Sequence, residues 1–486
     1  MAFFTRRKPF ELIHAQAEHK DLARTLSWPH LVALGVGAIV GTGILTLIGV
    51  GAGLAGPAVM ISFALAGLVC ACAALGYAEL STMMPASGSA YTYTYAVLGE
   101  GLAWIIGWSL ILEYSLVVSA VAVGWSGYAV GFLTGLGIDL PTALTVGPHV
   151  DGGAFNLPAV FIIAVVTGLL LLGTRESATV NAVLVVIKVA ALALFVAVAL
   201  PAFDPANFTP FMPNGFWLQG EAENGVATGR NLGVMAAAAI IFFAFYGFDA
   251  ISTAAEETKN PGRDLSIGIV GSMAICTALY LLVAAAAVGA MNYTRFADSP
   301  EPLALILREL GQGTAAQILA ASAVIALPTV LLAFLYGQSR IFLVMARDGL
   351  LPRGLAKISG RGVPVAVTLF TAVVVSVLAA FLRLDELASL ANAGTLAAFA
   401  AVGVCLMVLR VRDPNRPRVF RAPLWPVVGV ITVVGCLVFF FSLQPRTQFW
   451  FLIWNALGLV AYFAYGARHS LLGRTQAATE AAPPRV

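Results

Sequence analysis

Long apolar runs alternate with short polar stretches along the whole chain. Most of these runs reach the roughly 20 residues that an α-helix needs to cross a bilayer, so the pattern predicts an all-α polytopic membrane protein. The twelve expected spans are residues 29–53, 57–84, 101–134, 157–173, 178–200, 231–257, 264–290, 314–346, 363–381, 389–410, 424–442 and 448–467. A further short helix is expected around 302–310, in a polar loop between two spans.

The longest polar stretches divide the predicted spans into units. These units are a basic N-terminal leader along the cytoplasmic surface (1–27), a first set of five spans (28–200), an extracytoplasmic linker (201–230), a second set of five spans (231–410), two further spans (411–467) and a cytoplasmic tail (468–486). Because each set holds an odd number of spans, we expect the two sets to insert with opposite orientations.

The composition indicates a membrane protein, and the distribution of charge predicts how the chain is oriented in the membrane. Hydrophobic residues make up 60% of the 486 residues and charged residues 10%, with a mean hydropathy of +0.91, whereas a soluble chain carries about 25% charged residues. With the N-terminus inside, the cytoplasmic segments hold 20 of the 27 lysines and arginines and the opposite segments hold five. Cytoplasmic loops carry such an excess, so we predict a multi-pass protein of the cytoplasmic membrane with both termini in the cytoplasm.

Groups that could carry catalysis are sparse. The five histidines lie in the leader, at a helix start or in loops, and the five cysteines lie in apolar runs without metal-ligand spacing. An enzyme embedded in the membrane would need such groups clustered at membrane depth, and the chain has no ATP-binding motif. We therefore predict no enzyme activity, no cofactor, no metal site and no nucleic-acid partner.

The first span carries Gly35, Gly37, Gly41 and Gly43 in its apolar middle. Glycine costs roughly 1 kcal/mol in a helix interior, so the run Gly41-Thr42-Gly43 predicts a helix that breaks in mid-membrane. Broken backbone is tolerated at that depth where it lines a cavity or is buried in protein. Small residues at this spacing also suit close helix packing, and this run alone does not decide between the two interpretations.

The sixth span has a matching interruption at residues 246–249, which read YGFD. Paired interruptions at corresponding positions of two repeats indicate a transporter substrate site at the bilayer midplane. The N-terminus of a half-helix offers N–H groups to an anion, and unwound carbonyls accept hydrogen bonds from a cation. An α-amino acid carries both charges and is therefore the predicted substrate. Asp249, beside the interruption, is expected to cap the second half-helix.

Several motifs resemble, in this order, those of the amino acid–polyamine–organocation (APC) superfamily. They are GVGAIVGTGI at 35–44, YAEL at 77–80, PASGSAY at 85–91, FFAFYGFD at 242–249, EE at 256–257 with NP at 260–261, YGQSR at 336–340 and RDGLLP at 347–352. Within this superfamily the chain most resembles bacterial members of the cationic amino acid transporter family, over residues 25–465. The resemblance implies a LeuT-type fold: a five-plus-five inverted repeat with helices 1 and 6 broken, and two appended helices.

The resemblance also implies where the substrate binds. The residues concerned are Thr42 and Gly43, whose backbone would meet the carboxylate, and Ile39, Phe243, Ala244 and Tyr246, whose carbonyls would meet the ammonium. Two positions of the side-chain pocket depart from the family pattern. Relatives often have Ile or Val where this chain has Tyr246, and Leu327 lies in a run, ALPT, that replaces a common Gly-x-Thr-Thr. Both should narrow the pocket, so neutral L-amino acids are expected to be preferred over arginine and lysine.

Two charged residues, Glu113 and Lys188, fall at membrane depth. A charge at a helix centre costs roughly 2.5–3.5 kcal/mol on insertion, so each is expected to be functional or paired. The resemblance places Lys188 against the broken part of helix 1, where sodium-coupled relatives hold an ion. Bonds from its ammonium to carbonyls around Gly37 and Ala38 would couple its proton to helix 1. The alternatives are a permanently charged tether for Lys188 and a protonated or bonded carboxyl for Glu113.

The predicted function is a secondary active permease that carries L-amino acids across the membrane by alternating access, with proton-coupled symport. The alternative is a transporter or antiporter of cationic amino acids or polyamines. A channel or a receptor is a third class, and saturable, gradient-driven uptake would separate a carrier from both. The expected partners are L-amino acids, protons and membrane lipids, and the binding of a small regulatory membrane partner is left open.

Overall fold

The computed structural model describes residues 5–17, 26–85, 88–172, 178–218, 222–223, 226–227, 231–255, 258–357 and 364–474 of the 486. Part of the predicted leader (18–25), the EE motif at 256–257, parts of the linker and the tail from residue 475 lie outside these ranges. All statements below concern the described residues.

The described chain is helical apart from one two-residue hairpin, β1 (Ala222–Glu223) with β2 (Val226–Ala227). The helices are α2 (Phe10–Ala17), α3 (Trp28–Ile39), α4 (Thr42–Leu45), α5 (Leu47–Ala55), α6 (Val59–Met83), α7 (Ser89–Val97), α8 (Glu100–Gly135), α9 (Thr142–Thr145), α10 (Leu157–Leu171), α11 (Ala178–Ala199), α12 (Gly233–Ile241), α13 (Asp249–Thr253), α14 (Pro261–Ala290), α15 (Pro302–Glu309), α16 (Gly313–Arg347), α17 (Val365–Phe381), α18 (Leu384–Arg412), α19 (Trp425–Ser442), α20 (Pro445–Ala461) and α21 (Ala467–His469). Short 3₁₀ turns join several of them, among them η4 (Phe242–Ala244) directly after α12.

The helices confirm the predicted class of all-α polytopic membrane protein. Among the described residues, nine helical segments are long and apolar enough to cross a membrane, and three shorter apolar helices, α3, α10 and α17, accompany them. Their bounds follow the predicted spans within a few residues, and the short helix predicted around 302–310 is α15. The count of twelve spans, the inverted repeat and the division into units remain predictions.

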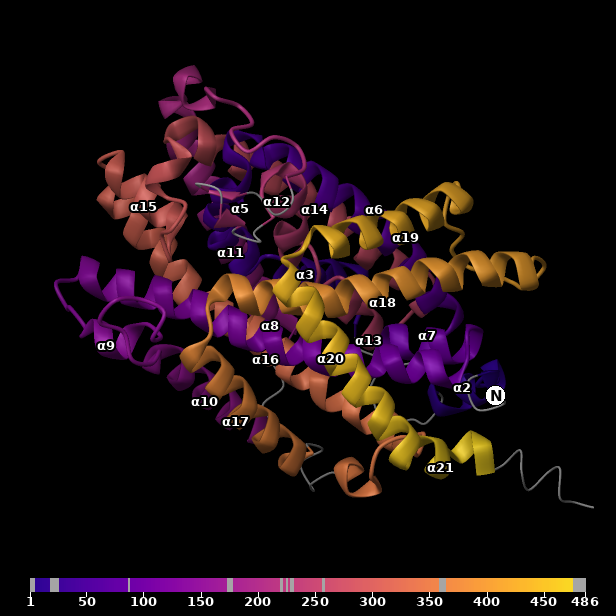
Figure 1. Ribbon diagram of the computed structural model, residues 1–486. Coiled ribbons are helices and arrows are strands. Elements are labelled where there is room, and N and C mark those ends of the chain that lie inside the picture. The colour runs from indigo at the N-terminus through magenta and orange to yellow at the C-terminus, as the bar shows by residue number, and fades with distance from the viewer. Residues whose placement is uncertain are drawn as a thin grey trace, which may run out of the picture.

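Three long helices, α8, α16 and α18, form the middle of the molecule, with α8 packed against both of the others (Figure 1). Helices α10 and α17 pack against each other along one flank. The short helices α9 and α15 lie at one end of the bundle, and the N-terminus, α2, α7 and α21 lie at the opposite end. The two ends therefore differ in construction, and below they are called the α15 end and the α7 end.

Helix α7 was not predicted, because it lies between the predicted spans 57–84 and 101–134. All nine of its residues are buried, although most are serine, threonine or tyrosine. Two of its tyrosines bond to buried carboxylates: Tyr91 donates to distant Asp348 at 2.8 Å, and Tyr95 donates to Glu100, five residues along the chain, at 2.8 Å. Buried polar groups need such partners, and the local sequence gives no sign of acceptors that lie more than 250 residues away, as Asp348 does.

The first part of the leader packs onto the same end. The Lys8 amide donates to the Tyr95 carbonyl at 3.2 Å, and the Glu100 amide donates to the Arg6 carbonyl at 2.8 Å. The side chains of Lys8 and Ile13 are buried. Residues 5–13 thus dock on the protein itself, and the place of the leader along the cytoplasmic surface stays a prediction.

Candidate functional site

The first predicted interruption lies between α3 and α4. Helix α3 ends at Ile39, and Val40 and Gly41 have extended backbone before α4 begins at Thr42. The Ile39 carbonyl accepts a hydrogen bond from the Tyr280 hydroxyl at 2.8 Å. Within the described chain, no backbone hydrogen bond starts from the amides of Thr42 or Gly43, as expected for the first turn of a helix.

A second interruption, at Thr46, separates α4 from α5. The freed Leu45 carbonyl accepts a hydrogen bond from the Tyr128 hydroxyl of α8 at 2.7 Å. The sequence predicted one break in this span, because Thr46 is embedded in apolar residues and no glycine marks it. The four residues of α4 are therefore held between two breaks.

The other predicted interruption separates α12 and its 3₁₀ turn η4 from α13. Gly247 has a φ of +117°, a conformation that only glycine adopts without strain, and its amide donates to the Asp249 carboxylate at 3.0 Å. Asp249 thus bonds inside the interruption, and its other oxygen accepts from the Tyr114 hydroxyl at 3.3 Å. Among backbone bonds of the described residues, none ends on the carbonyls of Phe243, Ala244 or Tyr246.

The two interruptions touch each other. A Cβ atom on Gly43 would lie 2.3 Å from the Cα atom of Ala244, and one on Gly247 would lie 2.9 Å from the carbonyl carbon of Ala38. Real Cβ atoms do not approach backbone so closely, so glycine is required at both points of contact. The structure therefore brings together the predicted residues of α3–α4 (Ile39, Thr42 and Gly43) and of the sixth span (Phe243, Ala244 and Tyr246).

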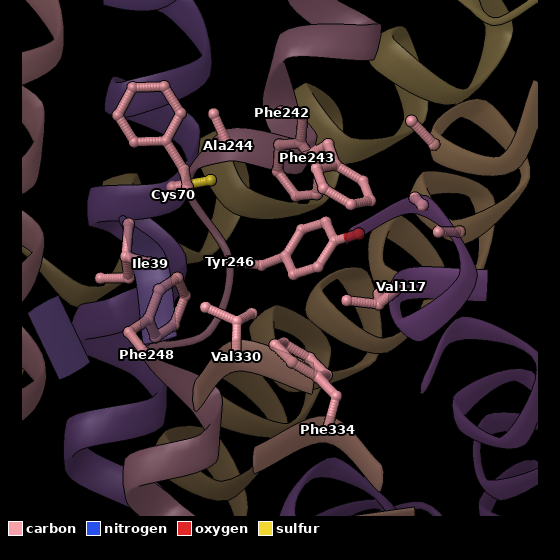
Figure 2. Close-up of a cluster of buried hydrophobic side chains, with 14 of the residues drawn as sticks. Ile39, Cys70, Val117, Phe242, Phe243, Ala244, Tyr246, Phe248, Val330 and Phe334 are labelled. Carbon is pink, nitrogen blue, oxygen red and sulfur yellow. The ribbon is translucent and has the colours of Figure 1, made fainter. Parts of the chain in front are cut away.

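A cluster of apolar side chains lies beside this contact. In Figure 2 the Tyr246 ring occupies its centre, between Phe243 and Phe334, with its hydroxyl on the side of Val117. The ring centroid of Tyr246 lies 4.9 Å from that of Phe243 and 6.2 Å from that of Phe334. Each of these side chains is at most 5% exposed, and the Tyr246 hydroxyl has no hydrogen-bond partner among the described residues.

Two residues of α16, Val330 and Phe334, face the Tyr246 ring (Figure 2). The sequence predicted Leu327 as the pocket residue of this helix. Leu327 is fully buried and lines a small crevice with Val40, Leu45 and Lys188. The sequence could not choose between these residues, because α16 is apolar on several faces. The role of Leu327 in the pocket remains a prediction.

Lys188 makes the contact that the sequence predicted. Its ammonium donates to the Gly37 carbonyl at 2.8 Å and to the Thr329 hydroxyl of α16 at 3.1 Å. The side chain is 5% exposed. Thr329 as a partner was not predicted, although it lies two residues after Leu327. Lys188 thus joins α11 to α3 and α16 immediately before the first interruption.

Glu113 lies on a different side of the site. Its side chain is 1% exposed, and neither carboxylate oxygen has a hydrogen-bond partner among the described residues. A Cβ atom on Gly394 of α18 would lie 3.2 Å from that of Glu113, so the carboxylate sits where α8 and α18 are packed together. A nearby amide, Asn392, donates to the carbonyls of Ala239 and Ile240 at 2.7 and 3.1 Å, which ties α18 to α12.

The α7 end of the bundle is closed by a buried ion pair. The Lys8 ammonium lies 2.7 Å from the Asp348 carboxylate, with side-chain exposures of 7% and 8%. The C-terminal segment joins them, because the Leu471 amide donates to the Asp348 carbonyl at 3.1 Å. The Glu100 carboxylate accepts from the hydroxyls of Tyr462 at 2.9 Å and Ser470 at 2.6 Å. Both terminal segments of the described chain therefore seal this end.

A second buried cluster at the same end surrounds Glu79 of α6. Its carboxylate accepts from Arg410 at 2.7 Å, from Arg418 at 3.0 Å and from the Ala422 amide at 2.8 Å. Arg418 also donates to three carbonyls of its own loop and to the Leu409 carbonyl of α18. Glu79 thus fastens the end of α6 to the end of α18 and to the loop after it.

The α15 end is hollow. A cavity of about 1000 Å³ opens there between α5, α8, the loop before α15 and the start of α18, and Thr46 is among its lining residues. Glu301 also lines it and forms an ion pair with Arg308. Burial raises the pKa of the Glu301 carboxyl, and the bond from Arg308 opposes that shift. The α7 end is therefore closed by buried polar contacts, whereas the cavity at the α15 end reaches the break at Thr46.

Comparison with known proteins agrees with this arrangement. A family model described as "Amino acid permease" matches residues 26–463. The branched-chain amino acid permease BcaP of Bacillus subtilis (strain 168) is 46% identical over 475 residues, which cover 97% of this chain and 99% of the relative. The methylthioribose transporter of the same organism is 43% identical over 477 residues, 98% and 100% of the two chains. The vacuolar cationic amino acid transporter 4 of Arabidopsis thaliana is 38% identical over 423 residues, 85% and 68%.

These relatives are named as permeases or transporters and not as enzymes, as the sequence predicted for this chain. The family match covers the interruptions, the ion pair's Asp348 and both charged residues at membrane depth. The resemblance to the APC superfamily is thereby confirmed, and the chain belongs to the amino acid permease family of multi-pass membrane transporters.

Proposed function

We propose that this chain carries neutral L-amino acids by proton-coupled symport, with the substrate held between the two interruptions. The observation that supports this proposal is the contact between the two broken segments. Their contact places backbone amides of α4 and carbonyls after α12, which have no backbone partner among the described residues, in one buried site. Backbone groups of these two kinds match the carboxylate and the ammonium that every α-amino acid shares. The side-chain cluster beside them then decides which amino acids fit.

That cluster favours an aliphatic side chain. The groups around the Tyr246 ring in Figure 2 are apolar: Val117, Phe243, Val330 and Phe334. Burying an aliphatic side chain against such groups is worth about 1.5–3 kcal/mol, whereas a cationic side chain would have to be desolvated there. The branched-chain permease named above supports the same choice. We therefore expect leucine, isoleucine and valine to be substrates, and Tyr246 has to move aside or pack against them.

Lys188 is the group that we assign to proton coupling. Its ammonium holds the Gly37 carbonyl, two residues before α3 ends, and the Thr329 hydroxyl of α16. Loss of the proton would cancel the positive charge and weaken both bonds, because a charge-assisted hydrogen bond is about twice as strong as a neutral one. The first span would then be free to shift against α16. Glu113 is the second candidate, since both of its oxygens lie unpaired among the described residues.

With the N-terminus in the cytoplasm, as the excess of positive charge on that side predicts, the closed α7 end faces inward. The cavity at the α15 end then faces outward. This state is the one in which a carrier would receive substrate from outside the cell.

Uptake of radiolabelled leucine into liposomes that contain the purified protein tests the substrate assignment. An inward proton gradient should drive accumulation, and isoleucine, valine and alanine should compete, while arginine, putrescine and methylthioribose should not. Strong competition by arginine with none by alanine would instead support the cationic alternative, with Glu113 as the partner of the substrate's positive charge. Competition by methylthioribose alone would rule out an amino acid site.

The Lys188→Ala variant tests the coupling. Uptake driven by a pH gradient should be lost, while binding of leucine to the detergent-solubilised variant should persist. Lys259→Ala removes an exposed lysine and serves as the matched control, which should retain uptake. Accumulation driven by pH in the Lys188→Ala variant, or an absolute requirement for sodium in the parent protein, would contradict the coupling role.

A further inference from the structure

We propose that an anionic phospholipid headgroup binds at the α7 end, on a basic patch formed by Arg7, Arg412 and Arg416. These arginines come from three segments that meet at the C-terminal end of α7. The backbone on either side of Arg7 is bonded to Glu100 and Tyr95. Arg412, the last residue of α18, donates to the Val97 carbonyl of α7 at 3.1 Å.

The third arginine reaches the same place from the loop after α18. The guanidinium carbon of Arg416 lies 3.8 Å from the centroid of the Phe10 ring in α2. Arg412 is repelled electrostatically by both Arg7 and Arg416. The basic patch is therefore one cluster of like charge and not three separate surface residues.

The basic patch is short of negative charge. Asp413 is the carboxylate that pairs with it in the described chain, at 3.6 Å from Arg416. Arg7 and Arg412 are exposed, so an anion from outside the protein can reach them. Like charges held together in this way repel one another, and a phosphate group, which accepts hydrogen bonds from several guanidinium groups at once, would relieve that repulsion.

Exposed apolar side chains in the same stretch of chain as two of the arginines point to a lipid as the source of the phosphate. Among the described residues the most exposed large apolar side chains are Leu424, Val411 and Val419, at 76%, 73% and 73%. All three lie within the 14 residues from 411 to 424 that also carry Arg412 and Arg416. Arginines interleaved with exposed apolar side chains are typical of a surface that sits at the headgroup level of a membrane.

The position of the basic patch implies an effect on the closed end. Arg7 is adjacent to Lys8, whose ion pair with Asp348 seals the α7 end. The three arginines are close together only while the N-terminal segment is docked, so a headgroup bound by all three stabilises the docked state and shifts the population toward it. Binding itself does not depend on which substrate is carried, whereas the effect on transport rests on the proposed function.

Thermal unfolding of the purified full-length protein in a neutral detergent can measure binding. Titration with short-chain phosphatidylglycerol should raise the melting temperature, and short-chain phosphatidylcholine should not. The triple variant Arg7→Gln, Arg412→Gln, Arg416→Gln should bind phosphatidylglycerol about 100-fold more weakly, because each arginine near an anionic surface contributes about fivefold. A matched triple variant, Lys259→Gln, Lys357→Gln, Arg468→Gln, removes three exposed cations outside the basic patch and should bind as the parent does.

Several results would overturn the proposal. One is an equal affinity of the two triple variants for phosphatidylglycerol. Another is a rise in melting temperature with phosphatidylcholine as large as that with phosphatidylglycerol. An equal rise with glycerol 3-phosphate would show that the patch binds an anion and not a lipid. If the patch variant does not fold, the parent protein still decides the matter. Its affinity for phosphatidylglycerol should fall steeply as salt rises from about 0.05 to 0.5 M, because screening weakens exposed charge pairs, and a salt-independent affinity would contradict the assignment.

Discussion

Removal of the Lys8 side chain should open the α7 end. Both partners of the Lys8–Asp348 pair are more than nine-tenths buried, and removal of one partner from a buried pair costs about 3–5 kcal/mol. Asp348 keeps the bond from Tyr91, so the lower value applies. A cost of about 3 kcal/mol in the closed state raises the ratio of open to closed molecules by about 100-fold.

A cysteine at a buried position that contacts α7 can report this opening. Ser252 is fully buried, and its hydroxyl contacts that of Ser89 in α7 at 3.2 Å. The five native cysteines are buried, so the parent without an added cysteine gives the background. In a Ser252→Cys protein, the Lys8→Ala change should speed labelling by a hydrophilic maleimide about 100-fold.

The control is Lys357→Ala in the same Ser252→Cys background, because Lys357 is an exposed lysine. It should leave the labelling rate unchanged. An unchanged rate in the Lys8→Ala protein as well would refute the reasoning, since it would mean that other contacts keep this end closed without the ion pair.

Three further predictions follow from single contacts. Gly43→Ala should abolish leucine binding, because the added Cβ meets backbone at 2.3 Å, whereas Gly41→Ala, with its nearest atom at 3.6 Å, should retain binding by equilibrium dialysis. Glu79→Gln removes the buried negative charge that pairs with Arg410 and Arg418 and should lower unfolding stability by about 3–5 kcal/mol, while Arg446→Gln, at an exposed pair, should cost less than about 1 kcal/mol. Because burial raises the pKa of Glu301 above its unfolded value, its contribution to stability is fully present at low pH and is lost as pH rises through the folded pKa. Melting temperatures between about pH 4 and 7 should therefore fall less in Glu301→Gln than in the parent, and parallel curves would contradict this.

The helices and the two main interruptions could be predicted because each leaves a local mark in the sequence. Apolar runs of bilayer length mark the spans, and glycines such as Gly41 and Gly247 mark the places where the helices break. The contact between Lys188 and the first span was predictable for a similar reason, since a lysine in an apolar run must find an acceptor. The family resemblance then indicated that carbonyls around Gly37 and Ala38 are the acceptors.

The structural features that were not predicted depend on contacts between different parts of the chain. Helix α7 is polar, and one of the carboxylates that its buried tyrosines bond, that of Asp348, lies 257 positions away in the chain. Val330 and Phe334, which face the Tyr246 ring, could not be separated from Leu327, because apolar side chains cover several faces of α16. The break at Thr46 is stabilised by the Tyr128 hydroxyl of another helix, which no local pattern reveals.

The ion pair at the α7 end has a consequence for the order of assembly. Lys8 and Asp348 are separated by 340 positions, and ribosomes add roughly 5–20 residues per second, so Lys8 is made about 20–70 s before its partner. Tyr91 of α7 precedes Asp348 by 257 positions, so its hydroxyl waits about 13–50 s for the same carboxylate. The ion pair that holds the docked N-terminal segment therefore cannot form until the chain has been made as far as Asp348. A chain that stops before α16 is complete would keep both segments exposed, which offers the cell a mark by which to distinguish unfinished molecules from finished ones.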